Sequence, residues 1–353
     1  MSSASYAYAP TSPALISKAL GDVFSAMESG EQRFNRSAHT NVIVATSSRD
    51  TLGAVEKTLD ALSLVHPSRF FVVYIDDSLP AVATEISARC HGLSRSEHAC
   101  SEVVRLGAPR SKLGLIPSVV RGHFMVGTPA ELYLADGAVS RELVDCLTPL
   151  VDLTIFDSED FAHRLDIIAE VARLCPALLD LEWIKLGPWR DEIKAAFSRA
   201  IVRDHLPMLT EVSIDASGGR GDIPPLHALL LAGWILDRLE LVRILGHHGD
   251  LRASFPRGGG RQVRLRFGGG RGVVAQIEEV AFRFGDGAGG GAVSFVRGQG
   301  LETHVELERR MRWSRPLEEE DREGLIRRYF LIGESTANYN AALRGALSLR
   351  YIE

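Results

Sequence analysis

Short apolar runs, each long enough for one strand, mark the first half of the chain. Asn41–Ala45 and Arg69–Ile75 are apolar at nearly every position, and so is Leu153–Phe156. Strands that are buried on both faces of a parallel sheet have this continuous pattern rather than an alternating one. We expect two further strands of the same sheet at Glu102–Leu106 and Glu131–Ala135.

Stretches with helical spacing of apolar residues alternate with these runs. Strands and helices in alternation predict an α/β domain, a mostly parallel sheet with flanking helices, over residues 35–160. Residues 1–34 precede it as a mobile tail of Ser, Ala, Tyr and Pro (1–13) and one helix. The predicted helices are Leu15–Met27, Asp50–Leu64, Lys112–Arg121, Arg141–Leu147 and Phe161–Leu174.

The pattern changes after about residue 208. A strand is expected at 208–215, a long apolar helix at Leu226–Leu245, and a last helix at Glu319–Leu347. Between these helices, runs such as RQVRLRF and VELERRM alternate apolar with charged residues and are separated by glycine triplets, as in half-exposed antiparallel strands. The sequence therefore predicts an α+β domain with an antiparallel meander over 208–353, joined to the first domain by a helical linker, 161–207.

Length and charge limit the class of protein. A chain of 353 residues is longer than one core usually holds, so two domains are expected. A net charge of −5 argues against a nucleic-acid partner, which needs clustered positive charge. We find neither an apolar run long enough for a membrane span nor a secretory signal, so we expect a cytoplasmic protein without a membrane partner.

The four cysteines, Cys90, Cys100, Cys146 and Cys175, have no framework spacing, so reduced thiols are the simplest interpretation. Cys90 and Cys100 are also a possible redox pair. With His91 and His98 they supply zinc-type ligands, but their spacing matches no common zinc motif, which favours ordinary buried thiols and surface histidines.

Motifs for cofactors and catalysis are weak or missing. Gly285, Gly287 and Gly290 match the glycine spacing of a dinucleotide-binding turn, but a strand-like segment follows where that turn needs a helix, so a hairpin loop is the better interpretation. The sequence contains no P-loop, no G-x-S-x-G and no H-E-x-x-H motif. We therefore predict no cofactor, no metal and no catalytic residue.

Acidic residues follow several predicted strands: Asp76, Asp77, Asp136 and Asp157. Ligands of open α/β sheets bind at this edge, so these acids could serve a nucleotide- or sugar-phosphate-binding enzyme. Turn formation and helix capping, also expected for Ser47 and Ser48, explain them more simply. Arginines of the late strands could likewise dock an acidic partner or only form a solvated face: Arg271, Arg283, Arg297, Arg309, Arg310 and Arg312.

The segment DLEWIKLGPWRDEIKAAF, residues 180–197, is unusual in composition. Trp183 and Trp189 lie six residues apart, with Pro188 and Arg190 on either side of the second. Trp and Arg dominate binding hot spots, although both tryptophans would serve equally well as core residues joining two domains.

This segment resembles the Asp-Leu-Asn-Trp…Leu-Thr-Pro-Trp-Arg signature of the OpcA family, the assembly proteins of glucose-6-phosphate dehydrogenase. Asp180, Leu181, Trp183, Leu186, Pro188, Trp189 and Arg190 match it, and HALLLAGWILDRLEL, with Trp234, resembles a helix of the same family. Other likenesses extend over about residues 36–245. Tyr133 and Leu134 stand where the family usually has tryptophans, which marks a divergent member.

The resemblance implies a non-catalytic protein that binds glucose-6-phosphate dehydrogenase and activates it allosterically in the oxidative pentose phosphate pathway. It also implies that Asp180, Trp183, Leu186, Pro188, Trp189, Arg190 and Trp234 are signature positions, either in contact with that partner or in the core. The alternative is the enzyme described above, acting through Asp76, Asp77 and Asp157.

Overall fold

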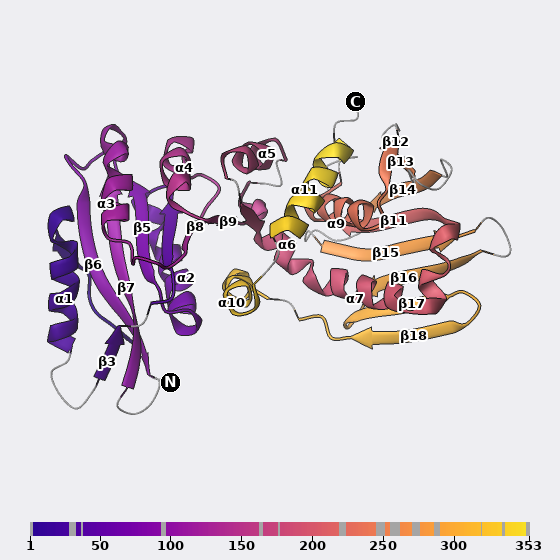
Figure 1. Ribbon diagram of the computed structural model, residues 1–353, viewed down its shortest axis with the longest axis horizontal. Coiled ribbons are helices and arrows are strands. Elements are labelled where there is room, and N and C mark those ends of the chain that lie inside the picture. Colours follow the sequence, from indigo (N-terminus) through magenta and orange to yellow (C-terminus); the bar gives the residue numbers. More distant parts are fainter. Residues whose placement is uncertain are drawn as a thin grey trace. The chain divides into compact units, whose positions relative to one another are not determined.

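The computed structural model places the chain in two compact units (Figure 1). It describes residues 3–27, 33–36, 38–92, 97–161, 165–175, 177–218, 224–244, 251–254, 262–269, 276–285, 290–318, 320–333 and 336–350. Unit 1 comprises Met1–Ala162, Asp166–Leu181 and Glu320–Glu334, and unit 2 comprises His163–Leu165, Glu182–Glu319 and Ser335–Glu353. The main part of unit 2 therefore begins just before Trp183, and the chain returns to unit 1 at Glu320–Glu334 before it ends in unit 2.

Unit 1 is an α/β unit built on one sheet with the strand order β1-β6-β7-β5-β4-β8-β9-β10. Its strands are β1 (Ser3–Ser5), β2 (Ala9–Thr11), β3 (Arg33–Arg36), β4 (Asn41–Thr46), β5 (Arg69–Ile75), β6 (Ala83–Gly92), β7 (Glu97–Ala108), β8 (Ala130–Leu134), β9 (Leu153–Phe156) and β10 (Leu178–Asp180). From β7 to β10 neighbouring strands are parallel. These six strands have the order 3-2-1-4-5-6 of a doubly wound fold, which confirms the predicted fold class.

The helices of unit 1 follow the predicted pattern with shifts at their ends. They are α1 (Ile16–Met27), α2 (Leu52–Val65), α3 (Ile116–Gly122), α4 (Arg141–Leu147), α5 (Leu165–Leu174) and α10 (Arg322–Ile332), with short 3-10 turns η1 (Pro13–Leu15), η2 (Arg49–Thr51), η3 (Arg110–Leu115), η4 (Thr148–Leu150) and η5 (Ser158–Phe161). The core of the sheet excludes solvent: the side chains of Ile43, Val44, Phe70 and Phe71 have no exposed surface.

Two expectations for unit 1 were wrong. The tail was predicted to be mobile, but β1 and β2 pair with β6, and Tyr8 between them donates a hydrogen bond from Oη to Glu56 Oε1 at 2.9 Å. Strand β6 itself was not predicted, since its sequence ATEISARCHG has no clear apolar pattern. Its Thr84 and Arg89 are nevertheless buried, because helices α1 and α2 also pack against this strand, and Arg89 pairs with Glu56 and Asp60 of α2.

Unit 2 is an α+β unit whose sheet has the order β12-β13-β14-β11-β15-β16-β17-β18. Its strands are β11 (Leu209–Ser217), β12 (Val242–Ile244), β13 (Leu251–Ser254), β14 (Gln262–Gly269), β15 (Gln276–Phe284), β16 (Gly291–Arg297), β17 (Leu301–Glu306) and β18 (Arg310–Arg315). Strands β15 to β18 are consecutive antiparallel neighbours, as in the predicted meander, whereas β11 lies between β14 and β15 and is parallel to β14. The other pairs of neighbouring strands are antiparallel.

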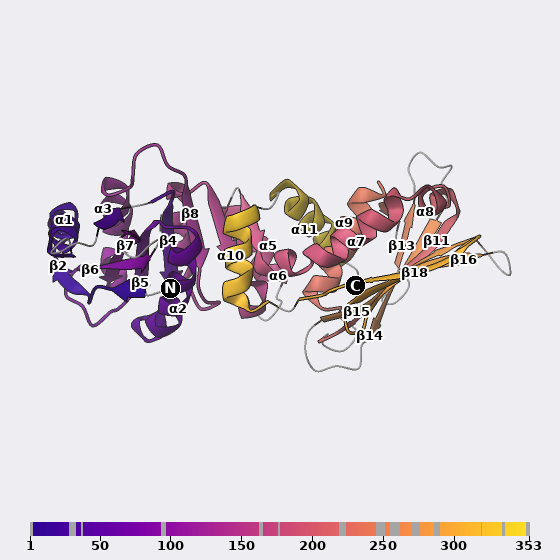
Figure 2. The ribbon, with the colours of Figure 1, turned by 90° about the horizontal axis from the view of Figure 1, so that it is seen from below.

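Helices pack on one face of this second sheet, as Figure 2 shows for α7 and α9. The helices of unit 2 are α6 (Leu181–Lys185), α7 (Gly187–Ser198), α8 (Ala200–Arg203), α9 (Leu226–Arg238) and α11 (Thr336–Arg350), with the 3-10 turn η6 (Leu206–Met208). Helices α9 and α11 pack closely at Gly233, where a Cβ atom would lie 2.2 Å from the carbonyl oxygen of Ala342. A glycine is therefore required at that crossing.

Two predicted helices were too long. The apolar helix was expected to reach Leu245 but ends at Arg238, followed by Glu240 with a φ of 51°. The last helix is two helices, α10 and α11, separated near Gly333, whose φ of 74° is in the left-handed region. Among the described residues, none of these helices combines the length and the apolar character of a membrane span.

Candidate functional site

The first turn of the parallel sheet, directly after β4, is the place where doubly wound folds bind phosphate groups. Here Asp136, which follows β8, occupies that turn. Its Oδ2 accepts hydrogen bonds from Thr46 Oγ1 at 2.7 Å and from the backbone N–H of Ser47 at 2.9 Å, and its Oδ1 accepts one from Ala138 N at 2.9 Å. A carboxylate thus holds the donors that a phosphate would need, and its charge repels an anion.

The other strand-end acids are also engaged in their own loops. Asp76 accepts hydrogen bonds from Ser78, which hold the pKa of the Asp76 carboxyl below its usual value. Asp77 accepts one from Arg110 N at 2.8 Å, and Asp157 Oδ1 accepts one from Glu159 N at 3.0 Å. The turn-forming interpretation is therefore supported for these acids. Capping by Ser48 was wrong, since its side chain makes no cap hydrogen bond to η2.

An arginine that the sequence did not single out lies beside two of these acids. Arg322, at the start of α10, contacts Asp157 at 3.0 Å and Asp160 at 2.6 Å. Burial raises the pKa of Asp160 and of the nearby Tyr133, while Arg322 favours the charged form of both. The cluster is an internal ion-pair network. No local signal could have revealed it, because Arg322 and Asp160 are 162 residues apart.

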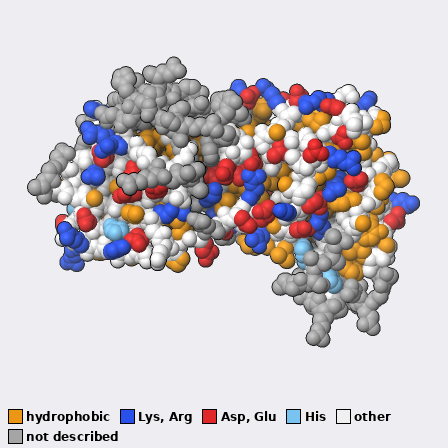
Figure 3. All heavy atoms as spheres, turned by 180° about the vertical axis from the view of Figure 1, so that it is seen from behind, with side chains coloured by type: hydrophobic (Ala, Val, Ile, Leu, Met, Phe, Trp, Pro, Cys, Tyr) orange, Lys and Arg blue, Asp and Glu red, His pale blue; other side chains and the backbone are white. Residues whose placement is uncertain are grey.

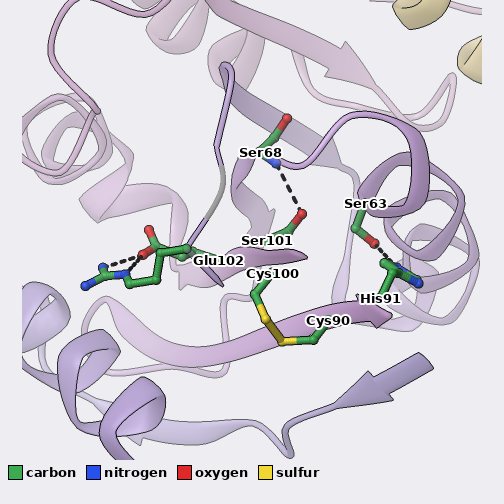
Figure 4. The surroundings of a disulfide bond; sticks show 8 residues. Ser63, Ser68, Cys90, His91, Cys100, Ser101 and Glu102 are labelled. Carbon is green, nitrogen blue, oxygen red and sulfur yellow. Dashed lines mark hydrogen bonds and ion pairs between the residues drawn. A yellow bond between two sulfur atoms is a disulfide. The ribbon is translucent and has the colours of Figure 1, made fainter. Parts of the chain in front are cut away.

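The Cys90–Cys100 pair forms a disulfide bond between β6 and β7 (Figure 4). The two cysteines face each other in the strand register, their Cα atoms are 4.1 Å apart, and both side chains are fully buried. Reduced thiols, our simplest interpretation, were therefore wrong for this pair but hold for Cys146 and Cys175.

A zinc site at these cysteines was also a wrong alternative, since the two sulfur atoms are bonded to each other. The flanking histidines have other neighbours. His91 Nε2 lies 3.0 Å from Ser63 Oγ (Figure 4), and the ring of His98 stacks on Phe34 with 5.0 Å between centroids. His98 is buried rather than on the surface.

The tryptophan segment forms part of the core of unit 2. Trp183, Trp189 and Trp234 are at most 2% exposed. The guanidinium carbon of Arg190 lies 3.7 Å from the centre of the Trp183 ring, and Arg190 Nη2 donates a hydrogen bond to the Trp183 carbonyl at 3.2 Å. Arg190 is itself only 3% exposed, so this cation–π contact is buried.

The remaining signature residues also make contacts within the fold. Leu186 is buried, Pro188 is half-buried in the first turn of α7, and Asp180, buried in unit 1, accepts a hydrogen bond from Ser158 N at 3.0 Å. Sequence reasoning missed Glu192, a buried carboxylate on α7 that accepts hydrogen bonds from Thr303 Oγ1 at 2.9 Å and from Trp313 Nε1. These contacts fix α7 to β17 and β18.

The glycine motif at Gly285 lies between the antiparallel strands β15 and β16, which supports its interpretation as a hairpin loop. Gly285 has a φ of 73°, and no helix follows the motif. Several predicted features lie outside the described residues: Gly287, the glycine triplet 258–260 and Arg271.

Residues 176–327 match a family model described as the C-terminal domain of a glucose-6-phosphate dehydrogenase subunit. Two curated relatives come from cyanobacteria. Each is named OpcA and is described provisionally as a protein of the OxPP cycle. The protein of Nostoc punctiforme is 28% identical over 191 residues, 51% of this chain and 40% of the relative. That of Synechocystis is 25% identical over 165 residues, 45% of this chain and 34% of the relative. The matches thus span less than half of each relative.

Solved structures with a similar arrangement include two oxidoreductases and a transcriptional regulator, all of low sequence identity. Biliverdin reductase from Synechocystis is 12% identical with a TM-score of 0.41, over 88% of this chain and 97% of that chain. An oxidoreductase from Sinorhizobium meliloti is 11% identical with a TM-score of 0.48, over 90% and 97% respectively. At these TM-scores the likeness is no guide to what this chain binds.

Proposed function

This chain belongs to the OpcA family, and from that premise we propose that it is a non-catalytic protein that binds glucose-6-phosphate dehydrogenase and favours the active form of that enzyme. The family match over residues 176–327 is the observation that carries the proposal. That segment includes Trp183, Trp189 and Trp234 and all strands of the second sheet, β11 to β18. The setting we propose is the cytoplasm and the oxidative pentose phosphate pathway.

The edge of the parallel sheet supports a non-catalytic role. In a dehydrogenase with this strand order, the turn after β4 would hold the cofactor's pyrophosphate. Asp136 takes the Ser47 N–H and the Thr46 hydroxyl at that turn instead. Arg322 is likewise committed to Asp157 and Asp160. Both sets of groups are satisfied internally, which leaves them unsuited to bind a dinucleotide.

The proposed activation has a simple thermodynamic basis. An activator shifts an enzyme toward its active state only by the difference in its affinity for the active and inactive states. A lower KM for glucose 6-phosphate, or a larger active oligomer, would each follow from tighter binding to the active state. Signature residues such as Trp183 would then act by maintaining the fold of unit 2, because they are buried within it.

A binding and kinetic experiment tests the proposal. The purified chain is mixed with glucose-6-phosphate dehydrogenase of the same organism, the complex is measured by sedimentation velocity, and initial rates are recorded over a range of glucose 6-phosphate. We expect co-sedimentation and a lower KM or higher kcat, while an equal concentration of serum albumin changes neither. No complex together with unchanged kinetics would refute the proposal.

A second candidate function, nucleotide or sugar-phosphate binding, is favoured by the strand order alone. Thermal-shift measurements with NADP, ATP and glucose 6-phosphate separate the two candidates. We expect no shift for the wild-type chain, because Asp136 blocks the phosphate turn. A rise of several degrees with any of these compounds would instead support the second candidate.

Redox control of activation is a further candidate, favoured by the Cys90–Cys100 disulfide. The activation assay is repeated with the oxidised chain, with the reduced chain and with the double variant Cys90→Ala/Cys100→Ala. Gating by the disulfide predicts that the reduced chain and the variant behave alike and differ from the oxidised chain. Equal activation by all three would remove this candidate.

A further inference from the structure

The second sheet ends on one side at a strand whose outer edge is open. Strand β18 is the last in the strand order, and its six residues all pair with β17 without a shift in register. Figure 1 shows it at the lower margin of unit 2, with no described strand or helix of that unit beside its outer edge. Every second residue of β18 therefore presents its backbone N–H and C=O groups to the outside.

Most of the devices that protect an edge strand are missing from β18. Natural sheets keep their edges from pairing by very short strands, proline, bulges, charge or a covering element. The opposite edge of this sheet is protected in the first way, because β12 has only three residues. Strand β18 is longer and regular, and the nearest proline, Pro316, follows its last residue. Only charge protects it, so the edge is open to a further strand of suitable charge.

The two faces of β18 differ in chemistry. Arg310, Arg312 and Ser314 are exposed on the face of the sheet away from the helices. Met311 and Trp313 alternate with them, are half-buried, and lie on the face that α7 covers. The edge thus offers cations on one face and apolar side chains on the other.

Arginine gives this edge its positive charge. Arg310 forms no ion pair with any residue that the structure describes, although Glu306 lies opposite it on β17. Arg312 pairs with Glu302, but its side chain is still 66% exposed, and Arg309 in the preceding turn is exposed too. Figure 3, seen from behind, shows Lys and Arg side chains with a few acidic ones along its lower left margin. Two copies of β18 would repel each other, whereas an acidic strand would be attracted.

Trp313 provides an ordered apolar surface on the other face. Its Nε1 donates a hydrogen bond to Glu192 of α7, and the guanidinium carbon of Arg199 lies 4.1 Å from the centre of its ring. These contacts hold the ring in place without burying it fully, and Met311 is two residues away on the same face. Tryptophans that are already ordered suit binding sites, because they lose little conformational entropy when a partner covers them.

We propose that the outer edge of β18 binds an extended segment of a partner protein in which acidic and apolar residues alternate. The segment adds a strand to the sheet and pairs its backbone with the outward N–H and C=O groups of β18. Since cross-strand neighbours share a face, its acidic side chains lie opposite Arg310 and Arg312, and its apolar side chains lie opposite Met311 and Trp313. Glucose-6-phosphate dehydrogenase is not required for this contact, so its test is separate from that of the proposed function.

Fluorescence anisotropy with labelled peptides tests the proposal on the purified chain. The probe is a peptide of about eight residues in which glutamate and valine alternate. A control peptide of the same composition has all its glutamates before all its valines, and so has equal charge without the alternation. We expect the alternating peptide to bind with a Kd below about 1 mM, and the control to bind at least about fivefold more weakly. No binding of the alternating peptide at about 1 mM, or equal binding of the two, would overturn the proposal.

Hydrogen exchange distinguishes strand addition from binding through charge alone. The alternating peptide at saturation should slow the exchange of backbone amides within Arg310–Arg315, because their outward N–H groups become hydrogen-bonded. Exchange in α9 should be unchanged. Binding without any protection of β18 would mean that only side chains are in contact, and the proposal would then be wrong.

Charge reversal tests the assignment of the arginines. Arg310→Glu should weaken binding of the alternating glutamate peptide by about fivefold and improve binding of a peptide in which lysine and valine alternate. Arg264→Glu makes the same charge change on β14, which four strands separate from β18, and should leave binding of the glutamate peptide unchanged. Circular dichroism checks that both variants fold. Equal affinity of the wild type and Arg310→Glu for the glutamate peptide would contradict the assignment.

Discussion

Trp183 and Arg190 show how much a single pair of side chains contributes to the second unit. Their ring and guanidinium stack in the core, and the Trp183 ring also contacts Tyr339 of α11, 6.1 Å between centroids. The pair thus connects α6, α7 and α11. This is the physical reason that a tryptophan and an arginine seven positions apart are required in the segment.

Replacing Trp183 should destabilise unit 2. Trp183→Ala removes a fully buried ring and should lower the free energy of unfolding by about 3–5 kcal/mol, whereas Trp183→Phe should cost less. Urea denaturation measures the effect, and Val126→Ala, at a fully exposed position, serves as the control. A Trp183→Phe variant of wild-type stability that no longer bound glucose-6-phosphate dehydrogenase would show that the ring contacts the partner directly.

Glu131 should make stability depend on pH. Burial raises its pKa to about 7, although Tyr329 Oη, 3.3 Å from Glu131 Oε1, donates a hydrogen bond to the carboxylate. The folded state therefore retains a proton that the unfolded state loses at about pH 4.5. The stabilisation is complete below that pH and is lost as the pH rises through 7, by at most about 3 kcal/mol.

Glu131→Gln tests this assignment, because a neutral amide does not titrate. The free energy of unfolding of the variant should vary less between pH 5 and pH 8 than that of the wild type, and at pH 8 the variant should be the more stable. Parallel pH profiles of the two proteins would mean that another group is responsible.

Among the elements, the β6–β7 pair is held by a disulfide bond between the two strands and by β1, a strand from the start of the chain. The disulfide joins residues separated by ten positions, and β1 covers the outer side of β6. Closing a loop of this length restricts the unfolded chain by about 2–3 kcal/mol in the chain-entropy model. The double variant Cys90→Ala/Cys100→Ala should be less stable by about that amount.

Thermal melts with and without reductant measure this effect. Reductant should lower the melting temperature of the wild type and leave that of the double variant unchanged, while Cys146→Ala, which removes a free thiol, should respond like the wild type. Non-reducing mass spectrometry reports the bond directly. Two free thiols at Cys90 and Cys100 in an oxidised sample would contradict the pairing.

The turn after β4 is the second element whose role depends on a distant residue. Asp136 satisfies two donors at this turn, so Asp136→Ala should cost about 1–3 kcal/mol of stability by leaving them without their acceptor. Chemical denaturation measures the loss, and Asp77→Ala, which removes one exposed loop contact, should cost less. Equal losses of stability in the two variants would show that the Asp136 hydrogen bonds stabilise the fold no more than the exposed Asp77 contact does.

At the scale of the whole molecule, the proposed binding to glucose-6-phosphate dehydrogenase rests on the family match over residues 176–327, which covers most of unit 2.

The sequence by itself determined the local features of both units. Buried parallel strands such as β5 and β9 were predicted to the residue, because continuous apolar runs of strand length have few other stable arrangements. The glycine motif was interpreted as a hairpin loop because the residues after Gly290 have the pattern of a strand, and they form β16. The family signature in residues 180–190 also required no structure.

Only the tertiary structure decided the features that depend on distant residues. The position of β11 between β14 and β15, the pairing of β1 with β6, and the placement of Arg322 beside Asp157 join segments far apart in the chain. Local propensity does not encode such contacts, because their free energy comes from packing in the complete fold. For the same reason the sequence could identify Trp183 and Arg190, but only the structure showed that both are buried.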